Sequence, residues 1–361
     1  MKKALAVFAM TLVFLAVLDG MAALALSEAE KRQKLGSLVR YFEYGRSVPG
    51  KLARWQAEPD LRDNLFDVSW RDALLAASAE GFRAEDPGRG PVIRSYGMSF
   101  TDNILHAAAE QDPTLVWDRH SGPGAPPNFT YAMVEDDAPS RRAGDVVVFG
   151  ILASSVPALA AFSNRSWAFE QPAPLTYPIY RPEGDGLARI DPLIASEAAE
   201  RALASDPDAA RAWADQMARE DAFYAPQTFG LTWADRSPFL RLVRRSLATA
   251  HVTKTERAIL DRRLYPYDVV LVRMIETFAE TVRTNDQYPV VMLVQTRDPG
   301  DADLLRMAKP VLDRLDIPYF ATAEHADPRD ISGFLPDGHY RPEVDAIFAE
   351  HFRALLAGLG T

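Results

Sequence analysis

The chain has 361 residues, with 40 Lys and Arg against 50 Asp and Glu, which gives a formal net charge of −10 at pH 7. Its 48% hydrophobic and 25% charged residues are typical of a globular protein. The acidic balance argues against a general nucleic-acid binder, since phosphate contacts require clustered Lys and Arg. Because the chain has no cysteine, disulfides, thiolate-held zinc, iron–sulfur clusters and a Cys nucleophile are excluded.

The N-terminus resembles a targeting segment. Lys2 and Lys3 precede an apolar run from Ala4 to Leu18, and Ala23-Leu24-Ala25 supplies small residues two positions apart. This order predicts a secretory signal peptide over residues 1–25 and an exported protein, periplasmic or extracellular. After cleavage no stable membrane insertion is expected. The alternative is an uncleaved anchor, because the apolar stretch is just long enough to cross a bilayer.

Residues 26–90 are predicted to form an N-terminal helical region, with Leu35, Leu38, Val39 and Phe42 at helical spacing. From Val92 onwards short apolar strands alternate with helices. Strands without polar alternation are buried on both faces, as in parallel sheets, so the prediction is an α/β three-layer sandwich with a mostly parallel sheet. The expected strands are 92–93, 115–117, 145–149, 290–294 and 318–321, and the expected helices are 100–111, 129–136, 268–283, 302–315 and 342–357.

The alternation stops within the chain. Residues 156–263 begin with a Pro- and Tyr-rich stretch and continue as Ala-rich helical sequence. We therefore predict an α/β core of residues 91–155 and 264–361, interrupted by an insertion or cap subdomain. The aromatic side chains of the stretch are Trp167, Phe169, Tyr177 and Tyr180. Packing onto the core is favoured for them over a sugar-stacking platform.

Two segments supply the groups that nucleophilic acyl transfer requires, namely a hydroxyl, a base, an acid that orients the base, and oxyanion donors. Ser99 follows the first predicted strand at the start of a helix, where free backbone N–H groups favour negative charge. Asp337 and His339 lie two positions apart before the last helix, and a turn at Gly338 can join them. The alternative is that Ser99 only caps its helix and that Asp337 makes a local turn.

These two segments, Ser95-Tyr96-Gly97-Met98-Ser99-Phe100-Thr101 and Phe334-Leu335-Pro336-Asp337-Gly338-His339-Tyr340, resemble the SGNH hydrolase superfamily of GDSL-like esterases. In that family the nucleophile follows strand one in a Gly-Asp-Ser pattern, and the Asp and His share one short loop. The resemblance implies Ser99 as nucleophile, His339 as general base and Asp337 as orienting acid on a flavodoxin-like fold. It implies no cofactor, and no His and carboxylate spacing indicates a metal site.

The sequence departs from the family pattern at two positions, one that supports the nucleophile loop in the family and one that supplies an oxyanion donor. Met98 stands where the family has Asp, and Gly150-Ile151-Leu152 stands where it has Gly-x-Asn. The resemblance implies a backbone donor at Gly122 or Gly124, and Ser154 or Ser155 is the candidate hydroxyl in place of the missing Asn. Arg119 and His120 are candidate substrate contacts, with a loop histidine bonded to a backbone carbonyl as the alternative for His120. Losing one oxyanion donor costs about 10²–10³ in rate.

The expected function is an exported serine esterase that removes O-acyl groups from carbohydrate or polysaccharide, with O-acetyl esters favoured by the resemblance. A sugar O-acyltransferase would use the same three residues. A non-catalytic polysaccharide-binding or assembly protein on a degenerate scaffold is the third possibility, motivated by Met98 and by the missing Asn. The sequence does not indicate an oligomeric state.

Overall fold

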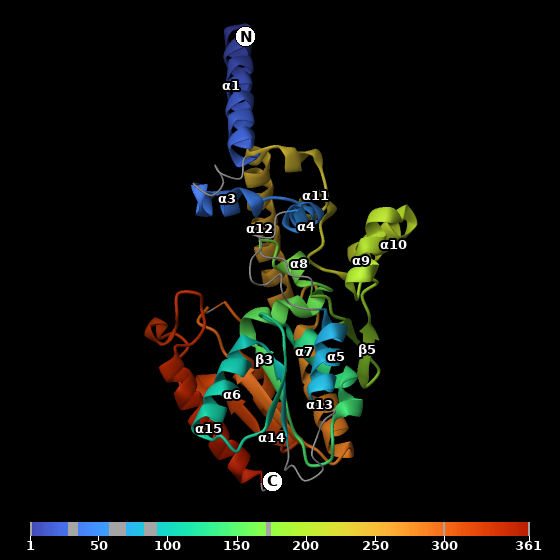
Figure 1. Ribbon diagram of the computed structural model, residues 1–361, viewed down its shortest axis with the longest axis vertical. Helices are drawn as coiled ribbons and strands as arrows, with labels where there is room; N and C mark the ends of the chain where they lie inside the picture. The colour runs from blue at the N-terminus through green and yellow to red at the C-terminus, as the bar shows by residue number, and fades with distance from the viewer. Residues whose placement is uncertain are drawn as a thin grey trace. The chain divides into compact units, whose positions relative to one another are not determined.

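The computed structural model describes residues 2–27, 35–57, 70–82, 92–170, 175–298 and 300–359 (Figure 1). The chain divides into two compact units. Unit 1 comprises Met1–Asp67, Asn164–Ala173 and Phe223–Thr255, and unit 2 comprises Val68–Ser163, Pro174–Ala222 and Glu256–Thr361. The predicted insertion is therefore shared between the units, because 174–222 belongs with the sheet whereas 164–173 and 223–255 join the N-terminal segment.

Unit 2 is built on a five-stranded sheet with the order β2-β1-β3-β6-β7. All four neighbouring pairs are parallel, which confirms the predicted α/β class. Numbered along the sheet-forming segments alone, this order is 2-1-3-4-5, that of flavodoxin-like doubly wound sheets. The strands are β1 (Ile93–Gly97), β2 (Trp117–Ser121), β3 (Val146–Leu152), β6 (Tyr288–Val294) and β7 (Tyr319–Ala321).

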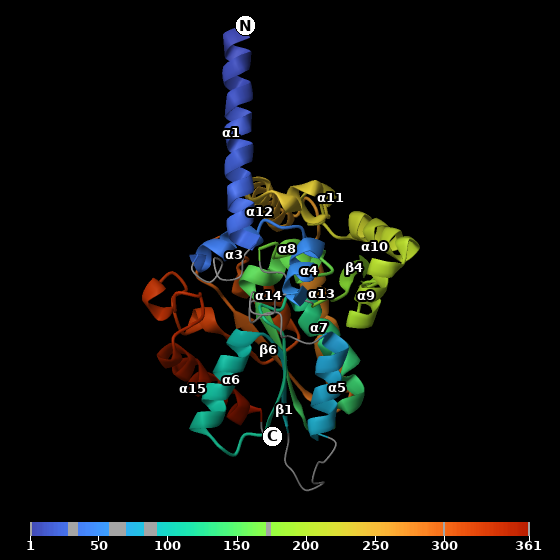
Figure 2. The ribbon, with the colours of Figure 1, turned by 45° about the horizontal axis from the view of Figure 1, so that its top comes forward.

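Helices cover both faces of this sheet (Figures 1 and 2). On one face α6 (Ser99–Gln111) packs against α15 (Pro342–Gly358). On the other, α13 (Tyr267–Thr284) packs against α7 (Pro127–Asp136) and α14 (Leu304–Arg314). Unit 2 also contains α5 (Arg71–Phe82), α9 (Glu197–Ser205), α10 (Pro207–Glu220) and the 3-10 turns η3 (Ala138–Ser140), η4 (Ala153–Ala160), η6 (Thr322–Glu324) and η7 (Ile331–Gly333).

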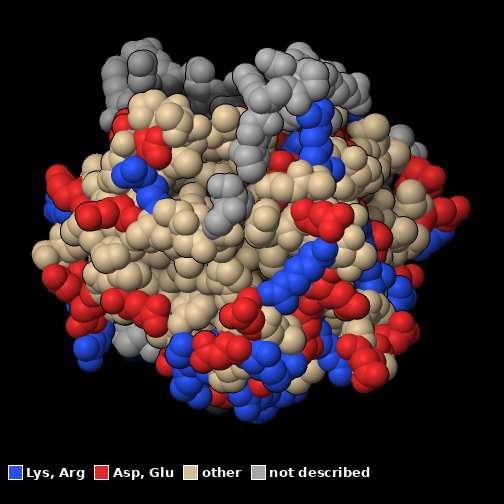
Figure 3. Space-filling view, turned by 90° about the horizontal axis from the view of Figure 1, so that it is seen from below, with Lys and Arg blue, Asp and Glu red and all other residues tan. Residues whose placement is uncertain are grey.

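Two parts of unit 2 differ from the sequence prediction. Strand β2 runs over 117–121 rather than 115–117, and it includes the buried polar residues Asp118 and His120. An antiparallel hairpin of β4 (Ile179–Glu183) and β5 (Gly186–Ile190) was not predicted. Tyr177 and Tyr180 are fully buried in this unit, as favoured for these aromatic residues. The face drawn in Figure 3 carries interspersed acidic and basic side chains without a continuous basic surface.

Unit 1 contains α12, which begins at Pro238 and ends at Leu260, its last five residues belonging to unit 2. A small apolar core of Val48, Phe169, Phe229 and Ala248 lies beside this helix. Lys51 is fully buried there and donates to the carbonyl oxygen of Phe169. The other elements are α1 (Lys2–Ser27), α3 (Ser37–Glu43), α4 (Val48–Ala57), α8 (Asn164–Trp167), α11 (Pro226–Phe229) and η5 (Trp233–Arg236).

Helix α1 is long and apolar enough to cross a membrane, with a mean hydropathy of 2.2 over its most apolar window. Length and composition fit either a signal sequence or a membrane anchor. Residues 2–17 are exposed along their whole length, whereas Leu26 near the end of the helix is buried.

Candidate active site

Ser99 is the first residue of α6, immediately beyond the carboxyl end of β1. Met98 is the N-cap, with an extended backbone at φ −144° and ψ −178°. The first amides of a helix have no partner within the helix, so the Ser99 N–H lies where negative charge is favoured. The Ser99 side chain does not cap α6, because no side chain bonds to the helix start and its hydroxyl has another partner.

That partner is the imidazole of His339. Ser99 Oγ lies 2.7 Å from His339 Nε2, and His339 Nδ1 lies 3.2 Å from Asp337 Oδ2. A carboxylate beside Nδ1 favours the proton on that nitrogen and leaves Nε2 to accept the hydroxyl proton. The structure thus brings together the three predicted catalytic residues in the order hydroxyl, imidazole, carboxylate, which is the arrangement of a catalytic triad.

The loop that carries the carboxylate and the imidazole is a tight reversal. Gly338 has φ 95°, a left-handed conformation that glycine adopts without strain. The Leu335 N–H donates to the His339 carbonyl oxygen at 2.7 Å, and the His339 N–H donates to Asp337 Oδ1 at 3.1 Å. The backbone alone therefore aligns Asp337 with the ring that follows it.

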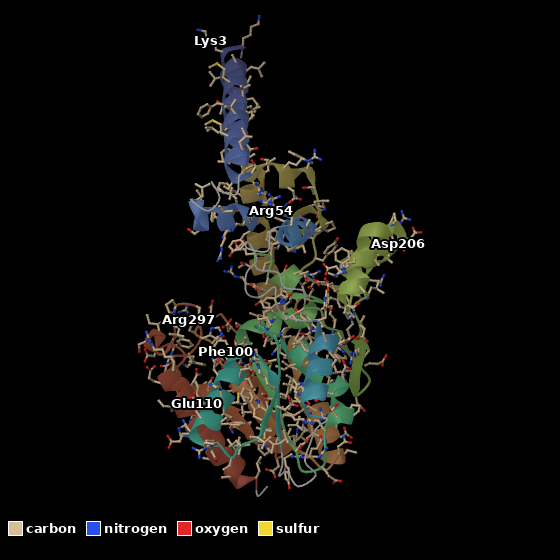
Figure 4. The ribbon with its side chains drawn as sticks, in the orientation of Figure 1. Lys3, Arg54, Phe100, Glu110, Asp206 and Arg297 are labelled. Carbon is tan, nitrogen blue, oxygen red and sulfur yellow. The ribbon has the colours of Figure 1, made fainter. Side chains whose placement is uncertain are left out.

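Two aromatic residues hold the imidazole in place. The His339 ring stacks on Phe100, with centroids 4.8 Å apart and an interplanar angle of 29°; Phe100 is labelled in Figure 4. The Tyr340 hydroxyl donates to the carbonyl oxygen of Gln295, which follows β6, and lies 3.2 Å from Thr322 Oγ1, which follows β7. The loop is thereby anchored at the carboxyl edge of the sheet, where groups from several strands meet.

The triad is open to solvent at its acidic end. The Asp337 side chain is 65% exposed and that of His339 is 32% exposed. The His339 backbone N–H, and secondarily its ring, lower the pKa of Asp337 below its usual range. The carboxylate is therefore ionised throughout the neutral range, and a bulky substrate can approach it.

Two glycines permit the close approach of strand and helix beneath Ser99. A Cβ on Gly97 or on Gly150 would lie 2.5 Å from the hydroxyl oxygen of Thr101. Thr101 is fully buried, and its hydroxyl donates to Met98 Sδ at 3.2 Å. Met98 thus fills the core under the turn, and both glycines are required by space rather than by backbone conformation.

Some of the candidate oxyanion donors already donate a hydrogen bond within the protein, and others do not. The Gly122 N–H donates to the Gly97 carbonyl oxygen at 3.3 Å, and the buried Ser155 hydroxyl bonds to the carbonyl oxygens of Ala125 and Leu152. Gly124 has φ 55° and open space around its Cα, and among the described residues its amide makes no hydrogen bond. Ser154 is exposed directly after β3. The Ser99 amide, Gly124 and Ser154 therefore remain as donors, whereas Gly122 and Ser155 do not.

Asp102 is a site residue that the sequence analysis missed. It lies in the first turn of α6, three residues after Ser99, and is 7% exposed. Its Oδ2 accepts from Ser121 Oγ at 2.6 Å and pairs with Arg119 Nε at 2.8 Å. Burial raises the pKa of Asp102. The carboxylate ties the end of β2, and so the loop containing Gly124, to the nucleophile helix; an acid three residues after the serine was the available signal.

Arg119 and His120 have different environments. Arg119 is 62% exposed beside the site, although its guanidinium is already paired with Asp102. The predicted substrate contact of His120 does not hold, because its side chain is buried, with Nε2 2.9 Å from Asp118 Oδ2 and the ring stacked on Tyr96. Arg94 also pairs with Asp118, at 2.9 Å. His120 therefore belongs to a buried network with Asp118 and Arg94 inside unit 2.

No protein-family model and no curated protein matches this chain. In the portion of the chain that the structure describes, no group of three or more His, Asp or Glu side chains could hold a metal ion. The site is therefore interpreted from its own geometry, in which the Ser99 hydroxyl contacts one ring nitrogen of His339 and the Asp337 carboxylate lies beside the other.

Proposed function

We propose that this protein is an exported serine ester hydrolase of the SGNH type, acting on O-acyl groups of carbohydrate. The observation that carries the proposal is the 2.7 Å contact between Ser99 Oγ and His339 Nε2, with Asp337 on the other ring nitrogen. Residues 240 positions apart in the chain meet in this contact. The loop that carries His339 also supplies the carboxylate beside Nδ1, so the three groups stand in the order that a triad requires.

In the proposed reaction Ser99 Oγ attacks the acyl carbonyl carbon while His339 Nε2 takes the hydroxyl proton. The carbonyl oxygen becomes an oxyanion beside the Ser99 amide, with Gly124 and Ser154 as further donors. His339 then protonates the leaving sugar oxygen, and the acyl group remains on Ser99. A water molecule, deprotonated by His339, attacks the acyl-enzyme and releases the carboxylic acid, which restores the serine.

The exposed edge of the triad supports a substrate group on a large molecule rather than one enclosed in a deep pocket. The resemblance of the two loops to GDSL-like esterases supports an acylated sugar, with acetyl as the favoured acyl group. Transfer to a sugar hydroxyl instead of water would use the same residues. The apolar α1 helix supports export, since a signal or an anchor directs the following chain across a membrane.

The first test is hydrolysis of p-nitrophenyl acetate together with covalent labelling by a fluorophosphonate. We expect Ser99→Ala to lower kcat/KM by about 10³-fold or more and to abolish labelling, because among the described residues Ser99 supplies the hydroxyl that contacts His339 and no other does. Ser332→Ala is the matched control. The Ser332 hydroxyl, like that of Ser99, makes a side-chain hydrogen bond, but its partner is Asp330 rather than His339. The activity and labelling of this control variant should equal those of the unchanged protein.

Equal activity of the Ser99→Ala variant would contradict the proposal. Absence of both activity and labelling in the unchanged protein, with polysaccharide binding retained, would favour the non-catalytic alternative. Acetylated oligosaccharide supplied with an unacetylated acceptor separates hydrolysis from transfer, because transfer yields newly acetylated acceptor in place of free acetate.

A further inference from the structure

The last turns of α1 are built into unit 1. Asp19 Oδ1 accepts the N–H of Phe239, the second residue of α12, at 2.8 Å. Ser237 Oγ accepts the next amide, that of Leu240, at 3.1 Å. Leu26 is only 5% exposed. Cleavage after Ala25 would remove the Asp19 cap of α12 and would place the buried Leu26 at a free chain end.

An apolar turn, Leu231–Trp233, lies shortly before the N-terminal end of α12. Leu231 is 69% exposed and Trp233 is 74% exposed. Thr232 and Asp235 form a capping box around η5, and Arg244 of α12 pairs with Asp235 at 2.8 Å and also donates to Thr232. The two apolar side chains are therefore held outward by a fixed framework. Leaving them in water costs free energy, about 25 cal/mol per Å² of apolar surface.

The position of this turn relates it to α1. Phe239, whose amide Asp19 caps, lies six residues after Trp233. Both ribbon views draw the start of α12 beside the end of α1 (Figures 1 and 2). Leu231 and Trp233 thus lie in the part of unit 1 from which the apolar helix departs.

The length of the exposed apolar segment of α1 can be compared with the thickness of a lipid bilayer, which is the candidate occupant of the Leu231–Trp233 turn. The 15 residues of the apolar run from Ala4 to Leu18 precede the packed turns and extend about 22 Å, less than a hydrocarbon core of about 30 Å. A short span is accommodated by local thinning of the bilayer and by snorkelling of its flanking residues, so the part of unit 1 that follows Leu18 lies close to the headgroup layer. Tryptophan is favoured in the headgroup layer, and lysines at a helix start remain on the cytoplasmic side.

We propose that α1 is retained as a membrane anchor and that the Leu231–Trp233 turn inserts into the lipid headgroup layer of the opposite leaflet. The lipid bilayer is the occupant of this apolar surface. This proposal does not depend on the esterase reaction, because every residue that carries it belongs to unit 1.

The test uses the full chain, purified from membranes and reconstituted in phosphatidylcholine–phosphatidylglycerol nanodiscs. Its intact mass should include α1 from the N-terminus. Because the chain has no cysteine, Leu231→Cys and Trp233→Cys each give one labelling site for a nitroxide. Lys254→Cys is the control. Lys254 is an exposed residue of α12, 15 residues beyond Phe239, which is about 22 Å along the helix axis.

We expect labels at 231 and 233 to collide with lipid-soluble oxygen several-fold more than with a water-soluble nickel complex, and the label at 254 to show the reverse. Equal water access at all three positions overturns the proposal, as does a mature chain beginning near Leu26. Labels at 231 and 233 that are shielded from both reagents indicate a protein occupant and also overturn it. As a second measurement, brominated lipid should quench less fluorescence in Trp233→Phe than in the unchanged chain.

Discussion

Asp337 orients the imidazole from an exposed position, which sets an upper limit on its contribution. Solvent screens an exposed carboxylate more than a buried one. We expect Asp337→Ala to lower kcat/KM by roughly 10- to 100-fold, below the ~10⁴-fold typical when a buried orienting carboxylate is changed. Esterase assays with Asp330→Ala as control check this, because Asp330 is an equally local acid that accepts from Ser332 instead. A loss as large as that of Ser99→Ala would contradict the proposed screening.

Asp345 in α15 is buried, in contrast to the exposed Asp337. It is 6% exposed, its Oδ1 has no hydrogen-bond partner among the described residues, and burial raises its pKa to about 7. Since the folded-state pKa lies above the unfolded value of about 4, folding favours the protonated acid. The free energy of unfolding should therefore fall as pH rises from about 4 to 7.

The corresponding prediction is that Asp345→Asn raises the free energy of unfolding at pH 8 by roughly 1–2 kcal/mol. At pH 4 the two proteins should differ little, because the carboxyl is then neutral in the folded state and only about half ionised in the unfolded state. Urea denaturation at the two pH values measures this, and a gain that is equal at both would show that ionisation is not its cause.

At the scale of elements, the tight crossing of β1, β3 and α6 yields a double-mutant test. Gly150→Ala should lower both the melting temperature and esterase activity, because its Cβ would lie 2.5 Å from Thr101 Oγ1 and 3.2 Å from Gly97 Cα. Removing the Thr101 hydroxyl relieves the shorter contact, so Thr101→Ala should recover much of the loss in the Gly150→Ala background. Additive losses in the cycle would contradict this steric explanation.

The elements that sequence predicted best were those whose burial comes from apolar side chains. β3 and β6 are continuous apolar runs and were found at nearly their observed bounds, as were α13 and α15. Strand β2 was displaced because Asp118 and His120 are buried through pairing with charged partners, and hydropathy cannot anticipate such pairing. The β4–β5 hairpin was missed because its sequence contains a proline, Pro182, and several charged residues.

Part of the candidate site could also be predicted from the sequence. Ser99, Asp337 and His339 were identified from residue type and chain order, which determine where groups lie on a parallel sheet. Residue type and chain order do not indicate whether a backbone amide is already hydrogen-bonded. The Gly122 amide is committed to Gly97, and this depends on the register of β1 against β2. The role of Asp102 likewise depends on Ser121 and Arg119, which come from another strand.

At the scale of the whole molecule, the two units are interleaved along the chain rather than arranged one after the other. Part of the predicted insertion packs into unit 2. Tyr177 lies edge-to-face on Phe129 with centroids 6.3 Å apart, and Arg189 pairs with Asp136 through both guanidinium NH groups, at 2.7 and 3.1 Å. These contacts join segments that a simple reading of strand alternation separates.

This interleaving predicts different outcomes for two deletions. Replacing residues 156–263 by a short Gly-Ser linker should give an insoluble chain, because it uncovers the buried rings that α7 presents to the hairpin. Replacing only residues 197–212 should leave a folded protein, since none of the described side chains there is buried. Circular dichroism and melting curves of the soluble fraction check both; a folded chain from the larger deletion would contradict the shared core.

The long separation between Ser99 and His339 has a consequence for the timing of synthesis. The serine and its helix emerge early, whereas the histidine follows 240 positions later in the chain. The hydroxyl therefore has no base until those intervening residues have been made. A chain that is threaded unfolded across a membrane would first acquire the complete triad on the far side, so under the proposed function nascent protein would leave acyl esters inside the cell untouched.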